Sequence, residues 1–232
     1  MMSERPVILT DVDGILVKWS SGLPFFAAKH NIPTDMMVQM IVDEKFRPMN
    51  EIFGCSDEFA EQMMTEYNNS SFIRFLSGYD DALVAVNELK KTYDFVAITA
   101  LGNTSTAAMN RMANLNILFP SAFKELMVVN HNESKTQRYL EAKKKYGNRI
   151  VCFIDDLATN LEDCHNVMSQ TPLIHMVRGP RKEPKCDVMT VKDWTCISKW
   201  LKEKRKAEFN AAFGEAVKAQ SVQPVQLSPI YP

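Results

Sequence analysis

Six side chains that could carry nucleophilic, acid–base or metal chemistry stand at the ends of predicted strands or at the start of a predicted helix: Asp11, Asp13, Thr99, Lys135, Asp155 and Asp156. The four carboxylates would repel one another strongly in one crevice unless a cation lay among them. Ligand sets made only of oxygen suit Mg²⁺. Lys135 and the Thr99 hydroxyl would then complement a phosphoryl group held against that metal. The set therefore predicts a magnesium-dependent site for phosphoryl chemistry.

The positions of these residues depend on alternating strands and helices. Short apolar runs predict strands over residues 7–10, 95–99, 126–129, 149–154 and 173–177. Helical patterns lie between the later strands, at residues 80–91, 104–118, 135–146 and 159–168. This alternation is typical of a doubly wound, mostly parallel α/β sheet of the Rossmann-like kind. Ligands bind such sheets beyond the carboxyl ends of the strands, which is where the acidic residues are expected.

The segment between the first and second predicted strands has a different pattern. Residues 20–77 show helical periodicity rich in Phe and Met, which predicts an inserted helical cap. We therefore expect a core built from residues 1–19 and 78–213, with a charged helical region over 192–213. Residues 214–232 include a proline-containing end and are predicted to be a disordered tail.

Composition narrows the class of protein. The chain has 232 residues, 46% of them hydrophobic, and a formal net charge of −1. This balance gives no support to binding of nucleic acid or an anionic membrane, and the apolar stretches are too short to cross a bilayer. The five cysteines are scattered and contain no CxxC pair, which favours reduced thiols. The composition predicts a soluble cytoplasmic protein and leaves the oligomeric state open.

The order of the polar motifs resembles the haloacid dehalogenase (HAD) superfamily in its phosphatase branch. The resemblance spans residues 7–177 and is carried by four motifs: Thr10-Asp11-Val12-Asp13-Gly14-Ile15-Leu16, Ile98-Thr99-Ala100, Ser134-Lys135, and Phe153-Ile154-Asp155-Asp156 followed by Asn160. It implies a HAD-like sheet, Mg²⁺ as cofactor and a small phosphorylated substrate. In that superfamily a helical insertion after the first motif is a C1 cap.

The resemblance also implies a role for each acidic residue. Asp11 would attack phosphorus and form an aspartyl-phosphate. Asp13 would protonate the leaving oxygen and then deprotonate the hydrolytic water. The metal would be bound by the carboxylate of Asp11, by the backbone carbonyl of Asp13 and by an acid of the last motif. We favour Asp156 as the direct ligand, with Asp155 binding directly or through water.

The remaining motif residues would bind the transferring group. By resemblance, Thr99, the backbone N–H of Ala100 and Lys135 would hold the phosphoryl oxygens. Lys124 is a weaker candidate for the lysine because it precedes a strand instead of opening a helix. Dehalogenases of the superfamily lack an acid at the position of Asp13, so phosphomonoester hydrolysis is preferred here.

Several alternatives stay open. A phosphomutase shares all four motifs, and a polynucleotide 3′-phosphatase would also fit them. A non-enzymatic receiver-like phospho-acceptor has a similar residue set, but in a different order along the chain.

The substrate also stays open between nucleoside monophosphates and sugar phosphates. Phe25 and Phe26 either stack on a base or form the core of the cap. The basic segment 178–185 follows a strand and could reach an anionic substrate, but a solvated loop is the preferred interpretation.

Overall fold

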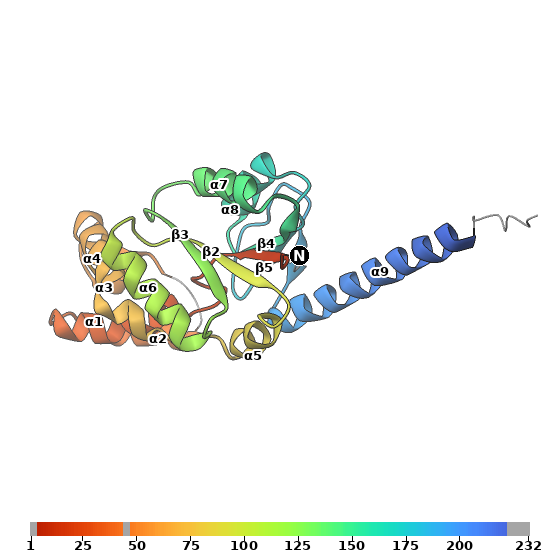
Figure 1. Cartoon of the computed structure of the whole chain (residues 1–232). Coiled ribbons are helices and arrows are strands. Elements are labelled where there is room, and N and C mark those ends of the chain that lie inside the picture. The colour runs from red at the N-terminus through yellow and green to blue at the C-terminus, as the bar shows by residue number, and fades with distance from the viewer. Residues whose placement is uncertain (1–3, 44–46, 222–232) are drawn as a thin grey trace, which may run out of the picture. The chain divides into compact units, whose positions relative to one another are not determined.

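The computed structural model describes residues 4–43 and 47–221, and its central feature is one parallel sheet (Figure 1). The strands in chain order are β1 (Val7–Thr10), β2 (Asp94–Ala100), β3 (Phe123–Val129), β4 (Ile150–Asp155), β5 (Leu173–Met176) and β6 (Met189–Val191). Their order across the sheet is β3-β2-β1-β4-β5-β6. This confirms the doubly wound α/β prediction. A receiver has the order 2-1-3-4-5, so the receiver-like alternative does not fit this topology.

Strand β1 lies in the middle of the sheet and pairs with two strands that are distant in sequence. Leu9 is in register with Val96 of β2 on one side and with Phe153 of β4 on the other. The chain builds the sheet outward from β1 through β2 and β3, and then returns to add β4 beside β1. The direction of winding therefore reverses between β1 and β4. A doubly wound sheet binds its ligand in the crevice at this reversal, beyond the carboxyl ends of the strands.

Helices cover both faces of the sheet (Figure 1). Helices α5 (Asp80–Leu89) and α6 (Ser105–Leu118) lie on one side, and α7 (Thr136–Tyr146) and α8 (Ala158–Val167) lie on the other. The short helix η3 (Gly147–Arg149) leads from α7 into β4. These helices match the predicted ones within a few residues at each end. Strand β6 was not predicted, because three residues are too few to show a pattern.

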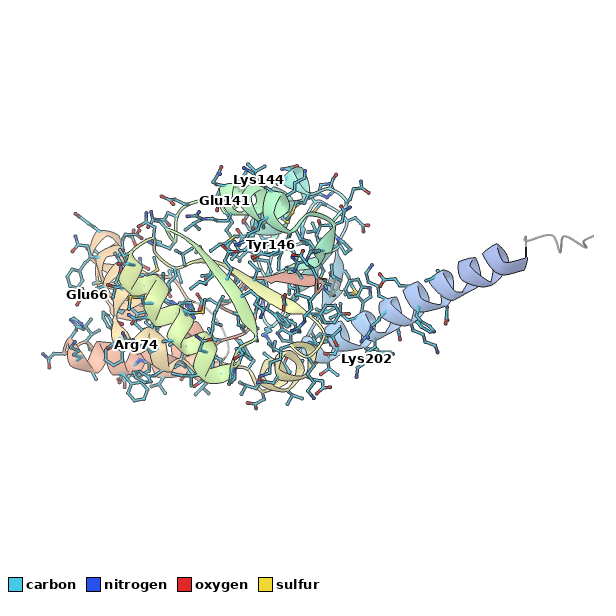
Figure 2. All side chains as sticks on the ribbon, viewed as in Figure 1. Glu66, Arg74, Glu141, Lys144, Tyr146 and Lys202 are labelled. Carbon is cyan, nitrogen blue, oxygen red and sulfur yellow. The ribbon has the colours of Figure 1, made fainter. Side chains whose placement is uncertain are left out.

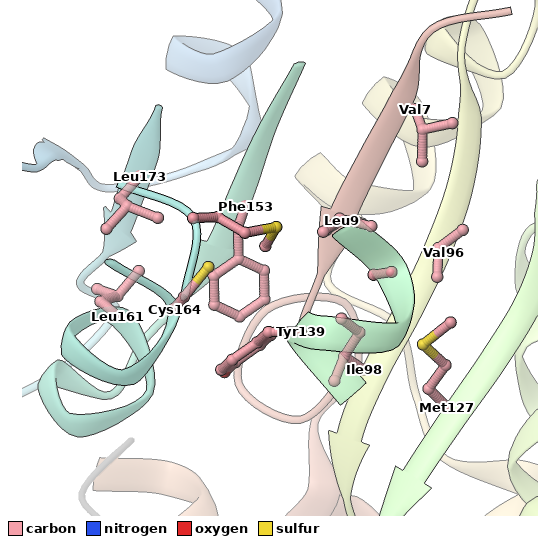
Figure 3. Packing of buried hydrophobic residues seen from close by; sticks show 12 residues of the cluster. Val7, Leu9, Val96, Ile98, Met127, Tyr139, Phe153, Leu161, Cys164 and Leu173 are labelled. Atoms are coloured by element: carbon pink, nitrogen blue, oxygen red, sulfur yellow. The ribbon is translucent and has the colours of Figure 1, made fainter. Parts of the chain in front are cut away.

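Alternate residues of the central strands form the core beneath α7 and α8 (Figure 3). Leu9 and Ile98 from the sheet pack with Tyr139 of α7 and Cys164 of α8, and all four are fully buried. Complete burial of a large apolar side chain contributes about 1.5–3 kcal/mol. Because this core fixes α7 against β1 and β4, it also fixes Lys135, the residue that precedes α7.

Residues 20–77 form helices, as predicted, in the described part of that segment. The helices are η1 (Trp19–Gly22), α1 (Leu23–Lys29), α2 (Asp35–Asp43), α3 (Met49–Phe53), α4 (Asp57–Asn69) and η2 (Ser71–Phe75). Phe26 is buried and packs edge-on against the aromatic rings of Phe53, Tyr67 and Phe72. The sheet and this helical segment belong to the same compact unit, which extends to Trp194. The division into core and cap domains stays a prediction.

Helix α9 (Trp194–Ser221) corrects the predicted start of the tail. The helix continues past residue 214, because its sequence keeps helix-forming residues up to Ser221. The rest of the predicted tail, residues 222–232, lies outside the described residues. The described residues 195–221 belong to a second unit. Within residues 4–43 and 47–221, no helix has both the length and the apolar character needed to cross a membrane.

Candidate active site

Three predicted carboxylates meet where β1 and β4 end. The backbone N–H of Asp11 donates to the carbonyl oxygen of Ile154 at 2.8 Å, which joins the end of β1 to the residue before Asp155. Asp11, Asp155 and Asp156 are all buried, and one carboxylate oxygen of each lies within 4.8 Å of the others. The structure thus brings together acids that are more than 140 positions apart in the sequence.

Lys135 lies inside this acidic group. Its Nζ is 2.6 Å from Oδ1 of Asp11 and 2.9 Å from Oδ2 of Asp155, and its side chain is only 2% exposed. Burial alone would lower the pKa of Lys135, but the two carboxylates outweigh it and raise the pKa. Burial raises the pKa of Asp11, Lys135 opposes this, and the neighbouring carboxylates add to the increase. Lys135 is therefore a permanent cation that holds two acids in place.

The two acids of the last motif have different surroundings. Asp155 accepts hydrogen bonds from Lys135, from the backbone N–H of Leu157 at 2.9 Å and from Nδ2 of Asn160 at 3.0 and 3.1 Å. Asp156 instead pairs through Oδ2 with Arg181, with Nε at 2.7 Å and Nη2 at 2.6 Å. Both oxygens of Asp155 are thus engaged, whereas Oδ1 of Asp156 accepts no hydrogen bond from the described residues.

The surroundings of Asp156 also change the pKa of its carboxyl group. Burial and the charge of Asp155 raise the pKa of Asp156 to about 6, and Arg181 limits the increase. Gly14 faces this carboxylate with a φ of 79°, and a Cβ added at residue 14 would lie 3.0 Å from Oδ2 of Asp156. The glycine therefore serves two purposes at once: it adopts a left-handed turn and leaves room for the acid.

Asp13 lies beside a different cation. Nη2 of Arg111, which belongs to α6, is 2.7 Å from both oxygens of Asp13. Burial raises the pKa of Asp13, and Arg111 counteracts part of the increase. The Thr99 hydroxyl also lowers the pKa of Asp13, although Oγ1 of Thr99 makes no hydrogen bond of ordinary geometry with any described residue. Thr99 is buried near the end of β2, and Ala100 is the last residue of that strand.

The structure changes the expected charge balance of the site. Four carboxylates are accompanied by three basic side chains, those of Lys135, Arg111 and Arg181. The sequence had suggested that a metal is needed to offset the four carboxylates. In the structure these three side chains already supply positive charge. The donor set still fits a hard divalent cation. Oδ2 of Asp11 and Oδ1 of Asp156 are not used by any described hydrogen-bond donor, and carboxylate oxygens are the ligands that Mg²⁺ prefers.

Sequence reasoning missed Arg111 and Arg181. The buried face of α6 carries Ala107 and Leu115 at helical spacing, but also Asn110, Arg111 and Asn114. Polar residues at core positions of a helix were the signal that could have identified this face.

The basic loop also differs from its interpretation. Arg181 pairs with Asp156, and Arg178 pairs with Asp81 at 2.7 Å, so residues 178–185 are not simply solvated. The two alternatives for the phenylalanines are divided between the two residues. Phe26 is buried in the interior of the helical segment, as the core alternative predicted, whereas Phe25 is 67% exposed and does not belong to that core.

The amino-acid sequence of the chain is similar to that of one curated phage protein. No protein-family model matches the chain. The "Uncharacterized 32.4 kDa protein in Gp30-rIII intergenic region" of Enterobacteria phage T4 is 42% identical over 197 residues, which cover 85% of this chain and 70% of the phage protein.

Solved structures share the fold at low sequence identity. An L-2-haloacid dehalogenase from Xanthobacter autotrophicus has a TM-score of 0.58 at 10% identity, covering 86% of this chain and 99% of that one. The magnesium-bound HAD-hydrolase YfnB from Bacillus subtilis has a TM-score of 0.56 at 16% identity, covering 86% and 100%. A subfamily IA HAD-superfamily hydrolase from Geobacter sulfurreducens has a TM-score of 0.56 at 14% identity, covering 85% and 96%. The chain therefore has the fold of the HAD-superfamily hydrolases and belongs to the same family as the phage T4 protein.

Proposed function

We propose that this protein is a Mg²⁺-dependent phosphomonoester hydrolase that acts on a small phosphorylated metabolite through an aspartyl-phosphate on Asp11. The observation that carries the proposal is the position of Asp11, held by Lys135 at 2.6 Å and grouped with Asp155 and Asp156. Asp13 lies two residues further along the same turn. A carboxylate nucleophile, a second acid and a fixed cation are the groups that phosphoryl transfer to and from an aspartate needs.

In the first step, an oxygen of Asp11 forms a bond to phosphorus while the bond from phosphorus to the leaving oxygen breaks. Protonated Asp13 gives its proton to that oxygen, which leaves as an alcohol. In the second step, Asp13 removes a proton from water and the water oxygen attacks phosphorus. The bond between phosphorus and Asp11 then breaks, and inorganic phosphate is released. Asp13 ends protonated, ready for the next cycle.

The phosphoryl oxygens carry negative charge that this chain's own residues can stabilise. Lys135 is a buried cation next to the nucleophile. The Thr99 hydroxyl is buried beside Asp13 and makes no hydrogen bond of ordinary geometry within the described part of the chain, and it is the second proposed donor. The backbone N–H of Ala100, at the end of the same strand, is the third proposed donor. Donors fixed in advance around developing charge lower the barrier without reorganisation.

The free carboxylate oxygens indicate which residues would hold the metal. Asp11 through Oδ2 and Asp156 through Oδ1 are proposed as direct ligands, together with the backbone carbonyl of Asp13. Asp155 is proposed to orient Lys135 and Asn160, because both of its oxygens already accept hydrogen bonds. Bound Mg²⁺ would neutralise charge on the transferring phosphoryl group.

Phosphoryl chemistry is preferred over dehalogenation because of Asp13. Some solved structures with this fold are dehalogenases, and in the superfamily those enzymes lack an acid two residues after the nucleophile. Asp13 is present here and lies close to Thr99 and Arg111. An acid at this position suits an alcohol leaving group, which needs a proton.

The direct test is phosphate release from a panel of nucleoside monophosphates, sugar phosphates and phosphorylated amino acids, measured with Mg²⁺ and with EDTA. We expect release from at least one class, dependent on Mg²⁺, and trapping of fluoroberyllate on Asp11. Absence of both activity and trapping would refute the proposal. Rearrangement of a sugar phosphate without release of phosphate would identify a phosphomutase instead.

A further inference from the structure

Arg111 is a fully buried arginine that faces the proposed acid–base residue. Its side chain is 0% exposed, whereas that of Asp13 is 24% exposed. Nη2 lies 2.7 Å from each oxygen of Asp13, so one nitrogen fixes the carboxylate symmetrically. Removing a guanidinium from water is unfavourable unless a partner compensates for the lost hydration. Asp13 is the partner that supplies this compensation.

The rest of the guanidinium is poorly suited to a purely structural role. Nε and Nη1 of Arg111 are buried and have no hydrogen-bond partner among the described residues. Each buried donor left unsatisfied lowers stability, because it has given up its hydrogen bonds to water. A methionine of similar length would fill the same space on α6 without this cost. These two nitrogens add nothing to the packing of α6, so the clear contribution of Arg111 is that it holds Asp13 in one position.

Helix α6 is itself fixed to the segment that closes the helical insertion. Nδ2 of Asn110 donates to the carbonyl oxygens of Asn69 at 3.3 Å and Ser70 at 2.8 Å. Nδ2 of Asn114 donates to the carbonyl oxygens of Arg74 at 3.2 Å and Leu76 at 2.9 Å.

A charged side chain adds to this attachment. Arg74, labelled in Figure 2, donates from Nε to Oδ1 of Asn110 at 2.5 Å. Asn110 and Asn114 lie on either side of Arg111 in the sequence, and both are about 1% exposed. The base of the Arg111 side chain is therefore held on a rigid support.

We propose that Arg111 is a positioning residue that aims the carboxyl group of Asp13 at the leaving oxygen and, later, at the hydrolytic water. The inference rests on the proposed function and adds a residue that the sequence motifs do not contain. Without Arg111, the carboxyl group of Asp13 is no longer held in the orientation from which it gives a proton to the leaving oxygen. Attack of Asp11 on phosphorus does not depend on Arg111.

Two substrates separate these steps. The leaving group of 4-nitrophenyl phosphate departs as a stable phenolate and needs no proton, whereas that of glycerol 2-phosphate is an alcohol and needs one. In Arg111→Met, the first turnover of 4-nitrophenyl phosphate should stay within about threefold of wild type, followed by slow steady-state turnover. The slow phase arises because Asp13 must still activate water. The first step with glycerol 2-phosphate should fall by about 10²-fold, within the range that general acid catalysis supplies.

Rapid-quench measurement of the phosphorylated enzyme, with stopped-flow measurement of nitrophenolate, provides the readout. Asp13→Asn should also slow the first step with glycerol 2-phosphate much more than the first step with 4-nitrophenyl phosphate. Its rates should fall further than those of Arg111→Met. Arg149→Met is the matched control. It removes an arginine that pairs with Glu4 at 2.8 Å and Asp94 at 3.7 Å at the amino ends of the strands, and it should leave both rates unchanged.

The outcomes are distinct. Equal losses on both substrates in Arg111→Met would overturn the positioning role and leave the phosphatase proposal intact. If wild type releases phosphate from no substrate of the broad panel, the proposed function fails and this inference fails with it. Arg111→Lys keeps the charge but not the reach of Nη2, and should recover part of the lost alcohol-release rate. If Arg111→Met fails to fold, the same comparison is made with Arg111→Lys, and equal losses in that variant also overturn the proposal.

Discussion

Lys135 and Asp11 form a buried ion pair, with Nζ 2.6 Å from Oδ1, although the two residues are 124 positions apart in the sequence. The lysine precedes α7 and the aspartate follows β1, so the pair exists only when the helix is packed on the sheet. Lys135 also contacts Asp155 at 2.9 Å. One cation therefore joins the proposed nucleophile to Asp155, the neighbour in sequence of the proposed metal ligand Asp156.

Replacing the nucleophile should abolish turnover and leave the fold intact. Asp11→Asn removes the charge that attacks phosphorus but keeps the shape of the side chain, so activity should fall about 10³-fold or more. Phosphate release and circular dichroism test the two halves of this prediction. Asp57→Asn, on the first turn of α4, is the control. Full activity in Asp11→Asn would show that another residue is the nucleophile.

Removing the buried cation should destabilise the protein as well as inactivate it. Lys135→Met leaves Asp11 and Asp155 buried without their shared partner, which should lower the free energy of unfolding by about 3–5 kcal/mol. Urea denaturation without metal measures the change. Lys143→Met removes an exposed lysine from the same helix, one that donates to the carbonyl oxygen of Val167. This control should change stability by less than about 0.5 kcal/mol. Similar stability in the two variants would contradict the prediction.

The metal-free protein should lose stability through this site as the pH rises from about 4 to about 6. The pKa of an unfolded aspartate is about 3.9, whereas the pKa of Asp156 is about 6 in the folded state and those of Asp11 and Asp13 are also raised. Between these values the folded state binds more protons than the unfolded state, so stability falls with increasing pH. Asp156→Asn cannot titrate and should lose less stability across this range. Urea denaturation in EDTA at several pH values provides the comparison, and identical slopes for the two proteins would refute it.

Magnesium should reverse this loss at neutral pH. A ligand that binds only the folded state at 100 times its dissociation constant stabilises that state by about 2.7 kcal/mol. The thermal midpoint of wild type should therefore rise with MgCl₂ but not with NaCl at the same ionic strength. The rise should be lost in Asp156→Asn, because the proposed direct ligand is weakened. A full response to Mg²⁺ in that variant would exclude Asp156 as an essential ligand.

Arg181 should oppose metal binding, because it neutralises the same carboxylate. Arg181→Gln is expected to bind Mg²⁺ about fivefold more tightly or better, in the range of typical coupling free energies. The metal-free variant should be less stable than wild type, since Asp156 loses its partner at 2.6 Å. Isothermal titration calorimetry measures the affinity, and Lys182→Gln is the neighbouring control. Weaker binding in Arg181→Gln would indicate that the arginine orients Asp156 instead of competing for it.

Much of the fold was predictable from local patterns. The apolar run before Asp11, the regular alternation after residue 78 and the helical pattern of residues 20–77 each reflect local periodicity, and the structure contains the corresponding elements. The candidate acids could be identified because each follows a strand. In a parallel sheet the carboxyl ends of the strands lie at one edge, so strand-terminal acids tend to meet there.

The arginines that pair with those acids could not be predicted from local sequence patterns, because the pairing depends on the tertiary structure. Arg111 lies in the middle of a helix and Arg181 in a loop, and neither belongs to a local pattern that identifies its carboxylate. Which acid each arginine meets is set by the packing of α6 and by the path of the chain after β5. The sequence by itself therefore determined the order of the motifs along the chain and the acids that they carry. The tertiary structure decided how their charge is balanced, because ion pairs between residues far apart in the sequence form only after the core has brought them together.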